Sequence, residues 1–123
     1  MDNKKMKILL FDDHLRINLN VLEKIGAAKG SFYIPYDHIV SAISDDSSNL
    51  SGMKVAGTNL PKLLEIGTYL SGTQKQFWYV KKRKHNFLIL VLKSNFYSKI
   101  ILELENSDDV SNKINELIRK GVK

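Results

Sequence analysis

One cluster in this sequence joins two carboxylates to a histidine, Asp12-Asp13-His14. A carboxylate and an imidazole can transfer protons or bind a metal ion when the fold brings further groups beside them. Neighbouring residues of a strand point to opposite faces, so adjacency alone argues against a shared site. A hairpin turn accounts for two consecutive aspartates, and this is the interpretation we adopt.

The other residues that could do chemistry form no recognisable site. His38 follows Asp37 near a strand end, His85 lies in a charged turn, and the chain contains no cysteine. No two histidines have the spacing of a zinc site on one element. Residues 26–31 are glycine-rich but lack the Gly-Lys-Ser/Thr ending of a phosphate-binding loop. The sequence therefore predicts a protein that is not an enzyme and that uses no metal or other cofactor.

A run of positive charge is the strongest surface feature. Lys81, Lys82, Arg83 and Lys84, here called the basic segment, lie between two apolar strand candidates. We expect this segment to form the tip of a β-hairpin. Clustered Lys and Arg on such a tip can bind phosphates, an anionic lipid surface or an acidic protein. The alternative is that the charges only protect an apolar hairpin from aggregation.

Three consecutive aromatic residues, Phe77, Trp78 and Tyr79, precede the basic segment. On a strand, Phe77 and Tyr79 share one face and Trp78 takes the other. One of these faces must be core, and the other could form an exposed platform for an RNA base or a peptide. Core packing is the more frequent outcome for aromatic residues, and Trp78 is kept as a candidate binding residue beside the basic segment.

Length and composition place the chain among globular proteins of one domain. Its 123 residues can bury one core and are too few for two, so we expect a single domain over residues 1–123. The longest apolar run, residues 87–92, is too short to span a bilayer, and the apolar run near the N-terminus is too short for a signal peptide. We therefore expect a cytoplasmic location.

The formal net charge is +6, and all of the excess lies in residues 61–123. Such an asymmetry suggests a polyanion or an acidic surface as partner, although a solvated face would show the same pattern.

The apolar pattern predicts about seven short strands followed by one helix. Residues 15–20 and 100–105 alternate with period two, whereas the continuous apolar run 87–92 is typical of a central strand. Residues 21–30 could hold a turn of helix, and Pro61 permits another within residues 59–65. Residues 45–52 have the composition of a loop. The other strand candidates are residues 5–11, 32–34, 39–43, 53–56, 66–70 and 76–81.

The chain ends in a segment whose apolar period changes to that of a helix. Ser107 is a suitable N-cap, and Asp108-Asp109 follow where negative charge favours the helix dipole. We predict a helix over residues 107–120, with one apolar face buried against the sheets. The residues of that face are Val110, Ile114, Leu117 and Ile118.

Several segments resemble a family of small bacterial proteins with a pleckstrin-homology-like (PH-like) fold, over roughly residues 5–121. The most specific are the Ile34-Pro35 strand end, residues 57–61 (GTNLP), and the hairpin that runs from Gly67-Thr68-Tyr69 to Phe77-Trp78. The resemblance implies a mainly β, PH-like sandwich or barrel of antiparallel strands capped by one C-terminal α-helix. Some small relatives of this fold in Gram-positive bacteria look like bacteriocin immunity proteins, but no motif here selects that role.

Phosphoinositide-binding PH domains carry a basic motif between their first two strands. The corresponding residues 21–30 offer only Lys24 and Lys29, so the resemblance does not extend to lipid specificity.

We therefore expect a non-catalytic binding module with a protein or peptide partner, because such folds present sheet edges and loops to peptides. The alternative is recognition of an anionic surface, either membrane headgroups or nucleic acid, through the basic segment. A homo-oligomer remains open.

Overall fold

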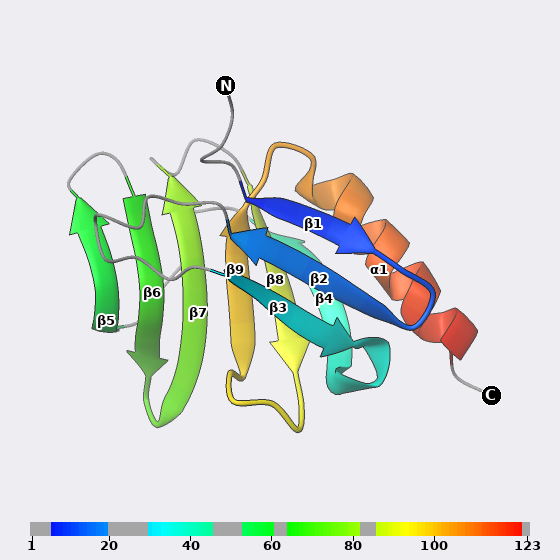
Figure 1. The fold of residues 1–123 in the computed structure, drawn as a ribbon, viewed down its shortest axis with the longest axis horizontal. Helices are drawn as coiled ribbons and strands as arrows, with labels where there is room; N and C mark the ends of the chain where they lie inside the picture. The colour runs from blue at the N-terminus through cyan, green and yellow to red at the C-terminus, as the bar shows by residue number, and fades with distance from the viewer. Residues whose placement is uncertain (1–5, 20–29, 46–52, 61–63, 82–85, 122–123) are drawn as a thin grey trace.

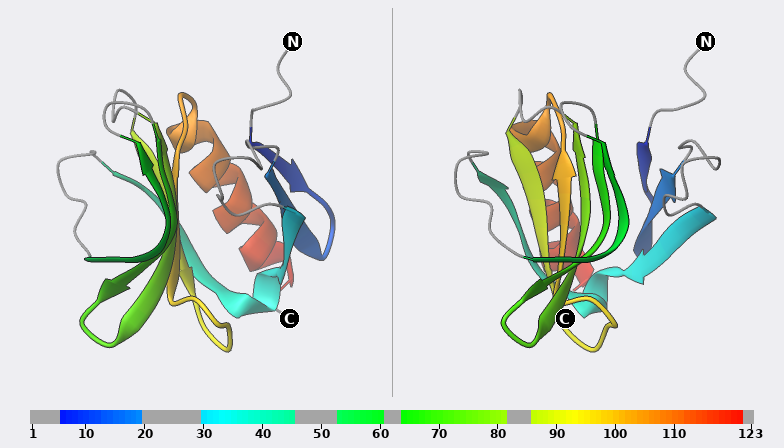
Figure 2. Two further views of the ribbon diagram at one scale, coloured as in Figure 1. Left: turned by 60° about the vertical axis from the view of Figure 1, so that its left-hand side comes forward. Right: turned by 90° about the vertical axis from the view of Figure 1, so that its left-hand side faces the viewer.

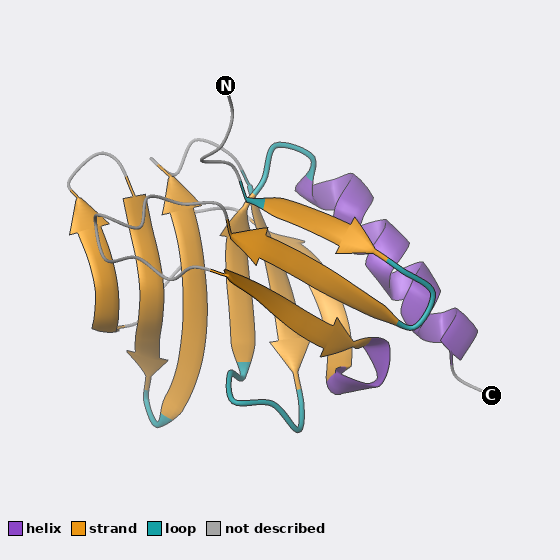
Figure 3. Cartoon of the chain, viewed as in Figure 1, coloured by secondary structure: helices purple, strands orange, loops and turns teal. Residues whose placement is uncertain are grey.

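A computed structural model describes residues 6–19, 30–45, 53–60, 64–81 and 86–121. These residues form nine strands, a short 3-10 helix and one α-helix (Figures 1 and 3). In chain order the elements are β1 (Lys7–Leu10), β2 (His14–Leu19), β3 (Gly30–Pro35), η2 (Tyr36–His38), β4 (Ile39–Asp45), β5 (Met53–Leu60), β6 (Leu64–Ser71), β7 (Gln74–Lys81), β8 (Phe87–Leu92), β9 (Lys99–Glu103) and α1 (Ser107–Gly121).

The strands form two sheets, and the prediction of a mainly β fold with one C-terminal helix is confirmed. A three-stranded sheet has the order β1-β2-β3, and a six-stranded sheet has the order β4-β8-β9-β7-β6-β5. Neighbouring strands are antiparallel with one exception, because β7 and β9 are parallel. The expectation of purely antiparallel sheets is therefore wrong at this pair.

The same pair corrects the prediction of a hairpin around the basic segment. β9 lies between β7 and β8 and hydrogen-bonds to both, so β7 and β8 are not neighbours. Five residues separate the end of β7 from the start of β8, a spacing that is typical of a hairpin. The pairing is decided instead by β9, which comes later in the chain and inserts between them.

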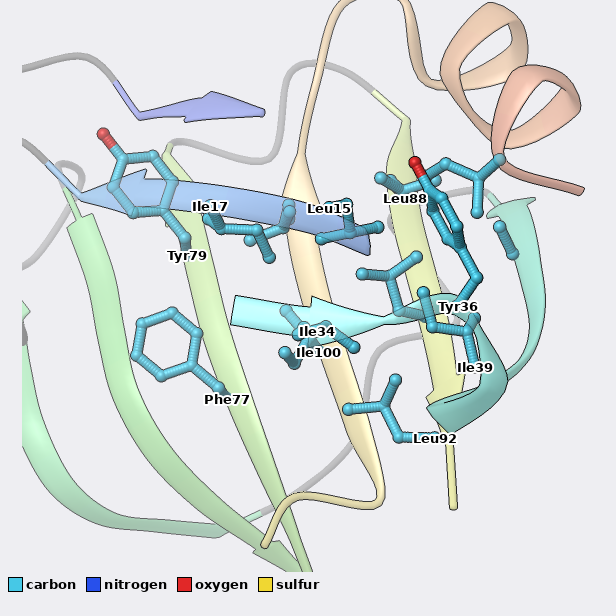
Figure 4. Packing of buried hydrophobic residues seen from close by; sticks show 14 of the residues in the cluster. Leu15, Ile17, Ile34, Tyr36, Ile39, Phe77, Tyr79, Leu88, Leu92 and Ile100 are labelled. Carbon is cyan, nitrogen blue, oxygen red and sulfur yellow. The ribbon is translucent and has the colours of Figure 1, made fainter. Parts of the chain in front are cut away.

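The helix and the three-stranded sheet cover the same face of the six-stranded sheet (Figure 2). The main core lies between these layers, where apolar side chains of β2 and β3 meet those of β7, β8 and β9 (Figure 4). The residues from β2 and β3 are Leu15, Ile17 and Ile34, and those facing them include Phe77, Tyr79, Leu88, Leu92 and Ile100.

A second apolar cluster lies on the opposite face of the six-stranded sheet. It contains Tyr69, Trp78, Val80, Phe87 and Ile101, all of them buried. Strand residues alternate between faces, so β7, β8 and β9 contribute to both clusters. This double burial explains why residues 87–92 are apolar without interruption, and the prediction of a central strand there is confirmed.

Helix α1 packs chiefly against β4, the edge strand of the six-stranded sheet. Of its four predicted core residues, Ile114 is fully buried, whereas Val110, Leu117 and Ile118 are half-buried against the main core. Ser107 is buried, and its hydroxyl lies 2.6 Å from that of Ser44 on β4.

The position of Ser107 in the helix differs from the predicted N-cap position. The Val110 N–H donates to the Asn106 carbonyl at 3.1 Å, so the helical hydrogen bonds already include Asn106, and Ser107 is the first residue of α1.

Three local predictions fall partly or almost wholly outside the described residues. In the segment around Pro61, β5 continues to Leu60 and β6 begins at Leu64, and residues 61–63, where a helical turn is permitted, lie outside the described residues. The two strands pair with each other up to Leu60 and Leu64. The helical turn within residues 21–30 and the loop after Asp45 lie almost wholly outside the described residues.

Candidate functional site

The outer face of the three-stranded sheet is set by the alternation of β2. Leu15, Ile17 and Leu19 are buried in the main core, so His14, Arg16 and Asn18 point away from it. The register places Leu9 of β1 and Tyr33 of β3 opposite Arg16. Leu9 is 38% exposed and Tyr33 58% exposed, so this face presents apolar surface to solvent.

Three rings form a stack on this face. The imidazole of His14 lies between Phe11, at 4.7 Å and 15°, and Tyr33, at 4.2 Å and 24°, measured between ring centroids and planes. Phe11 is 44% exposed although it takes part in the stack. The outer rings thus offer aromatic surface, whereas the central imidazole is largely covered.

Backbone hydrogen bonds fix the turn that carries the stack. The Phe11 N–H donates to the His14 carbonyl at 2.9 Å, and the Tyr36 N–H donates to the Asp13 carbonyl at 3.2 Å. The Tyr36 hydroxyl donates to the Phe11 carbonyl at 2.7 Å. Burial raises the pKa of Tyr36, so its hydroxyl remains a donor well into the alkaline range.

Asp13 and His14 form a pair beside the stack. Nδ1 of His14 lies 2.7 Å from Oδ1 of Asp13, and this hydrogen bond lowers the pKa of the carboxyl group. Asp12 and Asp13 connect β1 to β2, which confirms the predicted turn. Asp12 and Asp13 lie outside the strands, so the rule that neighbouring strand residues point to opposite faces does not apply to them. The contact between Asp13 and His14 was therefore not predicted from the sequence.

Charges of both signs surround the aromatic stack. Asp12, Asp13 and Arg16 are exposed near it, and the exposed Lys7 lies farther along the same sheet, opposite Asn18. One Nη atom of Arg16 donates to the Ser31 hydroxyl at 3.3 Å, across the β2–β3 pair. An aromatic centre with a mixed charged rim is the usual composition of a protein-binding surface.

Sequence reasoning missed this surface because its residues are scattered in the chain. Phe11 and His14 are separated by a turn, and Tyr33 reaches them through the pairing of β2 with β3. One signal in the sequence pointed to it. Polar residues alternate with apolar ones along β2, which indicates that one face of this strand is directed away from the core.

The predicted binding residues are not brought together in the described structure. Lys81 is the last residue of β7, and Lys82, Arg83 and Lys84 lie outside the described residues. Binding of an anion by the basic segment therefore stays a prediction. The expected β-hairpin is not formed, because β7 and β8 do not pair with each other.

Core packing of the aromatic trio is confirmed, and the alternative of an exposed aromatic platform is wrong. Phe77, Trp78 and Tyr79 are exposed by only 1%, 3% and 3%. The Trp78 indole stacks on Tyr69 with centroids 3.7 Å apart, and its N–H donates to Oε1 of Gln76 at 2.9 Å. Both faces of β7 are core, because the six-stranded sheet carries a cluster on each side.

A cavity of about 150 Å³ lies at the C-terminal end of α1. Its walls combine apolar side chains with one carboxylate and one ammonium group, from Tyr36, Asp37, Ile39, Lys93, Ile118 and Gly121. Within the described ranges, no three His, Asp or Glu residues are grouped to hold a metal ion. Nor does any helix there have the length and apolar character needed to cross a membrane.

No protein-family model, curated protein or solved structure matches this chain.

Proposed function

We propose that this chain is a non-catalytic binding module that recognises a protein through the outer face of its three-stranded sheet. The observation that carries the proposal is the solvent-exposed Phe11–His14–Tyr33 stack. Of the six exposed large hydrophobic residues in the described part of the chain, three lie at this one surface: Leu9, Phe11 and Tyr33.

The composition of this surface favours a protein over other partners. Aromatic residues and arginine are enriched at the centres of protein interfaces, where they account for much of the binding energy. On β1, β2 and the turn between them, the exposed Asp12 and Asp13 balance the exposed Lys7 and Arg16, which does not favour a polyanion. The anchored turn also means that little conformational freedom is lost on binding.

We also propose a PH-like domain of bacterial type and a cytoplasmic location. The resemblance of residues 5–121 supports the family, together with a mainly β architecture of two sheets and a C-terminal helix.

The test compares the wild type with the double variant Phe11→Ser/Tyr33→Ser in co-purification from the source cell at high salt. The matched control is Val40→Ser/Ile43→Ser, which removes two hydrophobic side chains of similar exposure from β4. Wild type and control should retain the same polypeptide, and the site variant should lose it by roughly 30-fold in affinity, as expected for an aromatic hot spot. Equal retention by both double variants would refute the proposal.

A further inference from the structure

Phe96 is exposed to solvent, whereas the phenylalanines of the core are buried. It is 67% exposed, the highest value among the large hydrophobic residues that the structure describes. It belongs to the connection from β8 to β9, which lies beside the β6–β7 turn at one end of the six-stranded sheet (Figure 3). The outer face of the three-stranded sheet does not include this residue, so the proposed function leaves it unexplained.

The position of Phe96 is fixed by its neighbour Tyr97. The ring of Tyr97 packs edge-on against Phe32 and Phe77 of the main core, and its hydroxyl lies 2.9 Å from that of Thr68. The Tyr97 N–H donates to Oδ1 of Asn95 at 3.1 Å. With Tyr97 held inward, Phe96 is held outward.

The two connections at this end are joined to each other. The Ser98 N–H and hydroxyl both donate to the Lys75 carbonyl, at 2.8 and 3.1 Å. The Lys75 ammonium lies 4.4 Å from the centroid of the Phe96 ring. This arrangement presents an apolar ring and a cation as one rigid projection.

The charge of this end is positive. Residues 71–75 and 93–99 contain Lys75, Lys93 and Lys99 and no carboxylate. Lys93 also lines the cavity at the end of α1, where Asp37 is one of the other lining residues. We call Phe96 and the three lysines the lysine–phenylalanine tip.

We propose that the lysine–phenylalanine tip docks on an anionic lipid bilayer. An aromatic ring that projects beyond its sheet can enter the interface between headgroups and acyl chains, while lysines bind the anionic headgroups. Stacking on a nucleic-acid base would need an open ring face. Lys75 lies over one face of Phe96, and Tyr97 meets the ring at 4.9 Å and 86°, so a base has at most one ring face on which to stack, which makes the bilayer the partner we propose.

The first experiment measures sedimentation with vesicles of equal parts phosphatidylserine and phosphatidylcholine, against vesicles of phosphatidylcholine alone. We expect binding only to the anionic vesicles, and less of it as salt rises. Lys75→Gln/Lys93→Gln should weaken binding roughly 25-fold, at about fivefold for each lysine. Phe96→Ser should weaken it roughly tenfold without changing the charge.

The charge-matched control is Lys113→Gln/Lys120→Gln, which removes two lysines from the exposed side of α1, both beside Glu116. It should bind vesicles as the wild type does. Equal weakening by both lysine double variants would overturn the proposal, because net charge would then explain the binding. Binding to a single-stranded oligonucleotide but not to anionic vesicles would also overturn it.

A second readout locates the bound residue. Trp78 is the one tryptophan of the chain and is buried, so its emission should not respond to vesicles. Phe96→Trp should add an exposed emission that shifts to the blue on anionic vesicles and is quenched by brominated lipid. No shift in a variant that still sediments with vesicles would overturn the placement of the ring. Phe11→Ser/Tyr33→Ser should bind vesicles normally, which separates this proposal from the protein-binding one.

Discussion

A single backbone angle at Gly72 decides how β6 turns into β7. Gly72 has φ of +65°, in the left-handed region that L side chains rarely adopt, and a two-residue turn joins Ser71 to Gln74. A Cβ atom at Gly72 would meet nothing within 4 Å. The requirement for glycine is therefore conformational and not steric.

The first prediction follows from this angle. Gly72→Ala should lower the free energy of unfolding by about 1–2 kcal/mol, the cost of a Cβ in the left-handed region. Gly121→Ala is the control, since Gly121 ends α1 without a positive φ and its Cβ would also meet nothing. That variant should keep or slightly raise stability in urea denaturation. A Gly72→Ala midpoint equal to the wild type would contradict the argument.

Gln76 provides a buried hydrogen bond to Trp78 of the second apolar cluster. It is 5% exposed, and its Oε1 accepts the indole N–H of Trp78. Gln76→Leu should leave this buried donor unsatisfied and destabilise the fold by about 1–3 kcal/mol. Unfolding can be followed by the fluorescence of Trp78. Gln74→Leu, at an exposed position of the same strand, should change stability by less than about 0.5 kcal/mol; similar losses in both variants would argue against the indole bond.

At the level of elements, α1 covers the free edge of β4. Oδ1 of Asn115 accepts the Ala42 N–H at 2.9 Å, and its Nδ2 donates to the Ala42 carbonyl at 2.8 Å. The side-chain amide thus takes the place of a neighbouring strand. Covering an edge in this way satisfies its backbone groups and prevents edge-to-edge association.

Asn115→Ala should therefore destabilise the fold by about 1–3 kcal/mol, because two partly buried backbone groups lose their partner. It should also increase self-association, which light scattering below the melting temperature can detect. Asn112→Ala, at an exposed position of the same helix, is the control and should do neither. Unchanged stability and scattering in Asn115→Ala would show that solvent satisfies the edge equally well.

Removal of the whole helix is the larger change at this scale. Burial of Ile114 contributes about 1.5–3 kcal/mol, and the three half-buried apolar residues together add a similar amount. That sum approaches the lower end of the net stability of a typical domain, about 5 kcal/mol. Truncation before Ser107 should therefore give an unfolded or aggregated chain. Cooperative melting of the truncated chain near the full-length temperature would show that α1 is dispensable.

For the molecule as a whole, two buried tyrosines link stability to alkaline pH. Burial raises the pKa of both Tyr36 and Tyr79 above 10.0, although each hydroxyl also has a hydrogen bond that acts in the opposite direction. Above this value the unfolded chain loses these protons before the folded chain does. Stability should therefore be constant below the ordinary tyrosine pKa and fall as pH rises through the raised values.

Urea midpoints measured between about pH 8 and pH 11 test this linkage. Tyr36→Phe/Tyr79→Phe should start from lower stability at pH 8, because two hydrogen bonds are lost, but should show a flatter alkaline decline. Tyr33→Phe is the control, since Tyr33 is exposed and should leave the slope unchanged. An equally steep decline in the double variant would assign the alkaline sensitivity to other groups.

Local patterns in the sequence determined most elements of this protein. Alternation at residues 15–20, the apolar run 87–92 and the change to helical period after Asn106 each matched a strand or helix at nearly the predicted bounds. These features depend on residues within one turn or one strand, so short-range periodicity contains the information. The turn at Asp12-Asp13 belongs to the same class.

Only the tertiary structure decided how the strands pair and which surfaces remain exposed. β9 separates β7 from β8, and this long-range insertion buries both faces of β7 and with them Trp78. The Phe11–His14–Tyr33 stack likewise exists because β3 pairs with β2 in one register, and Phe96 projects because Tyr97 is held in the core. Pairing between distant strands is a property of the whole folded chain, so no local pattern could assign either candidate surface.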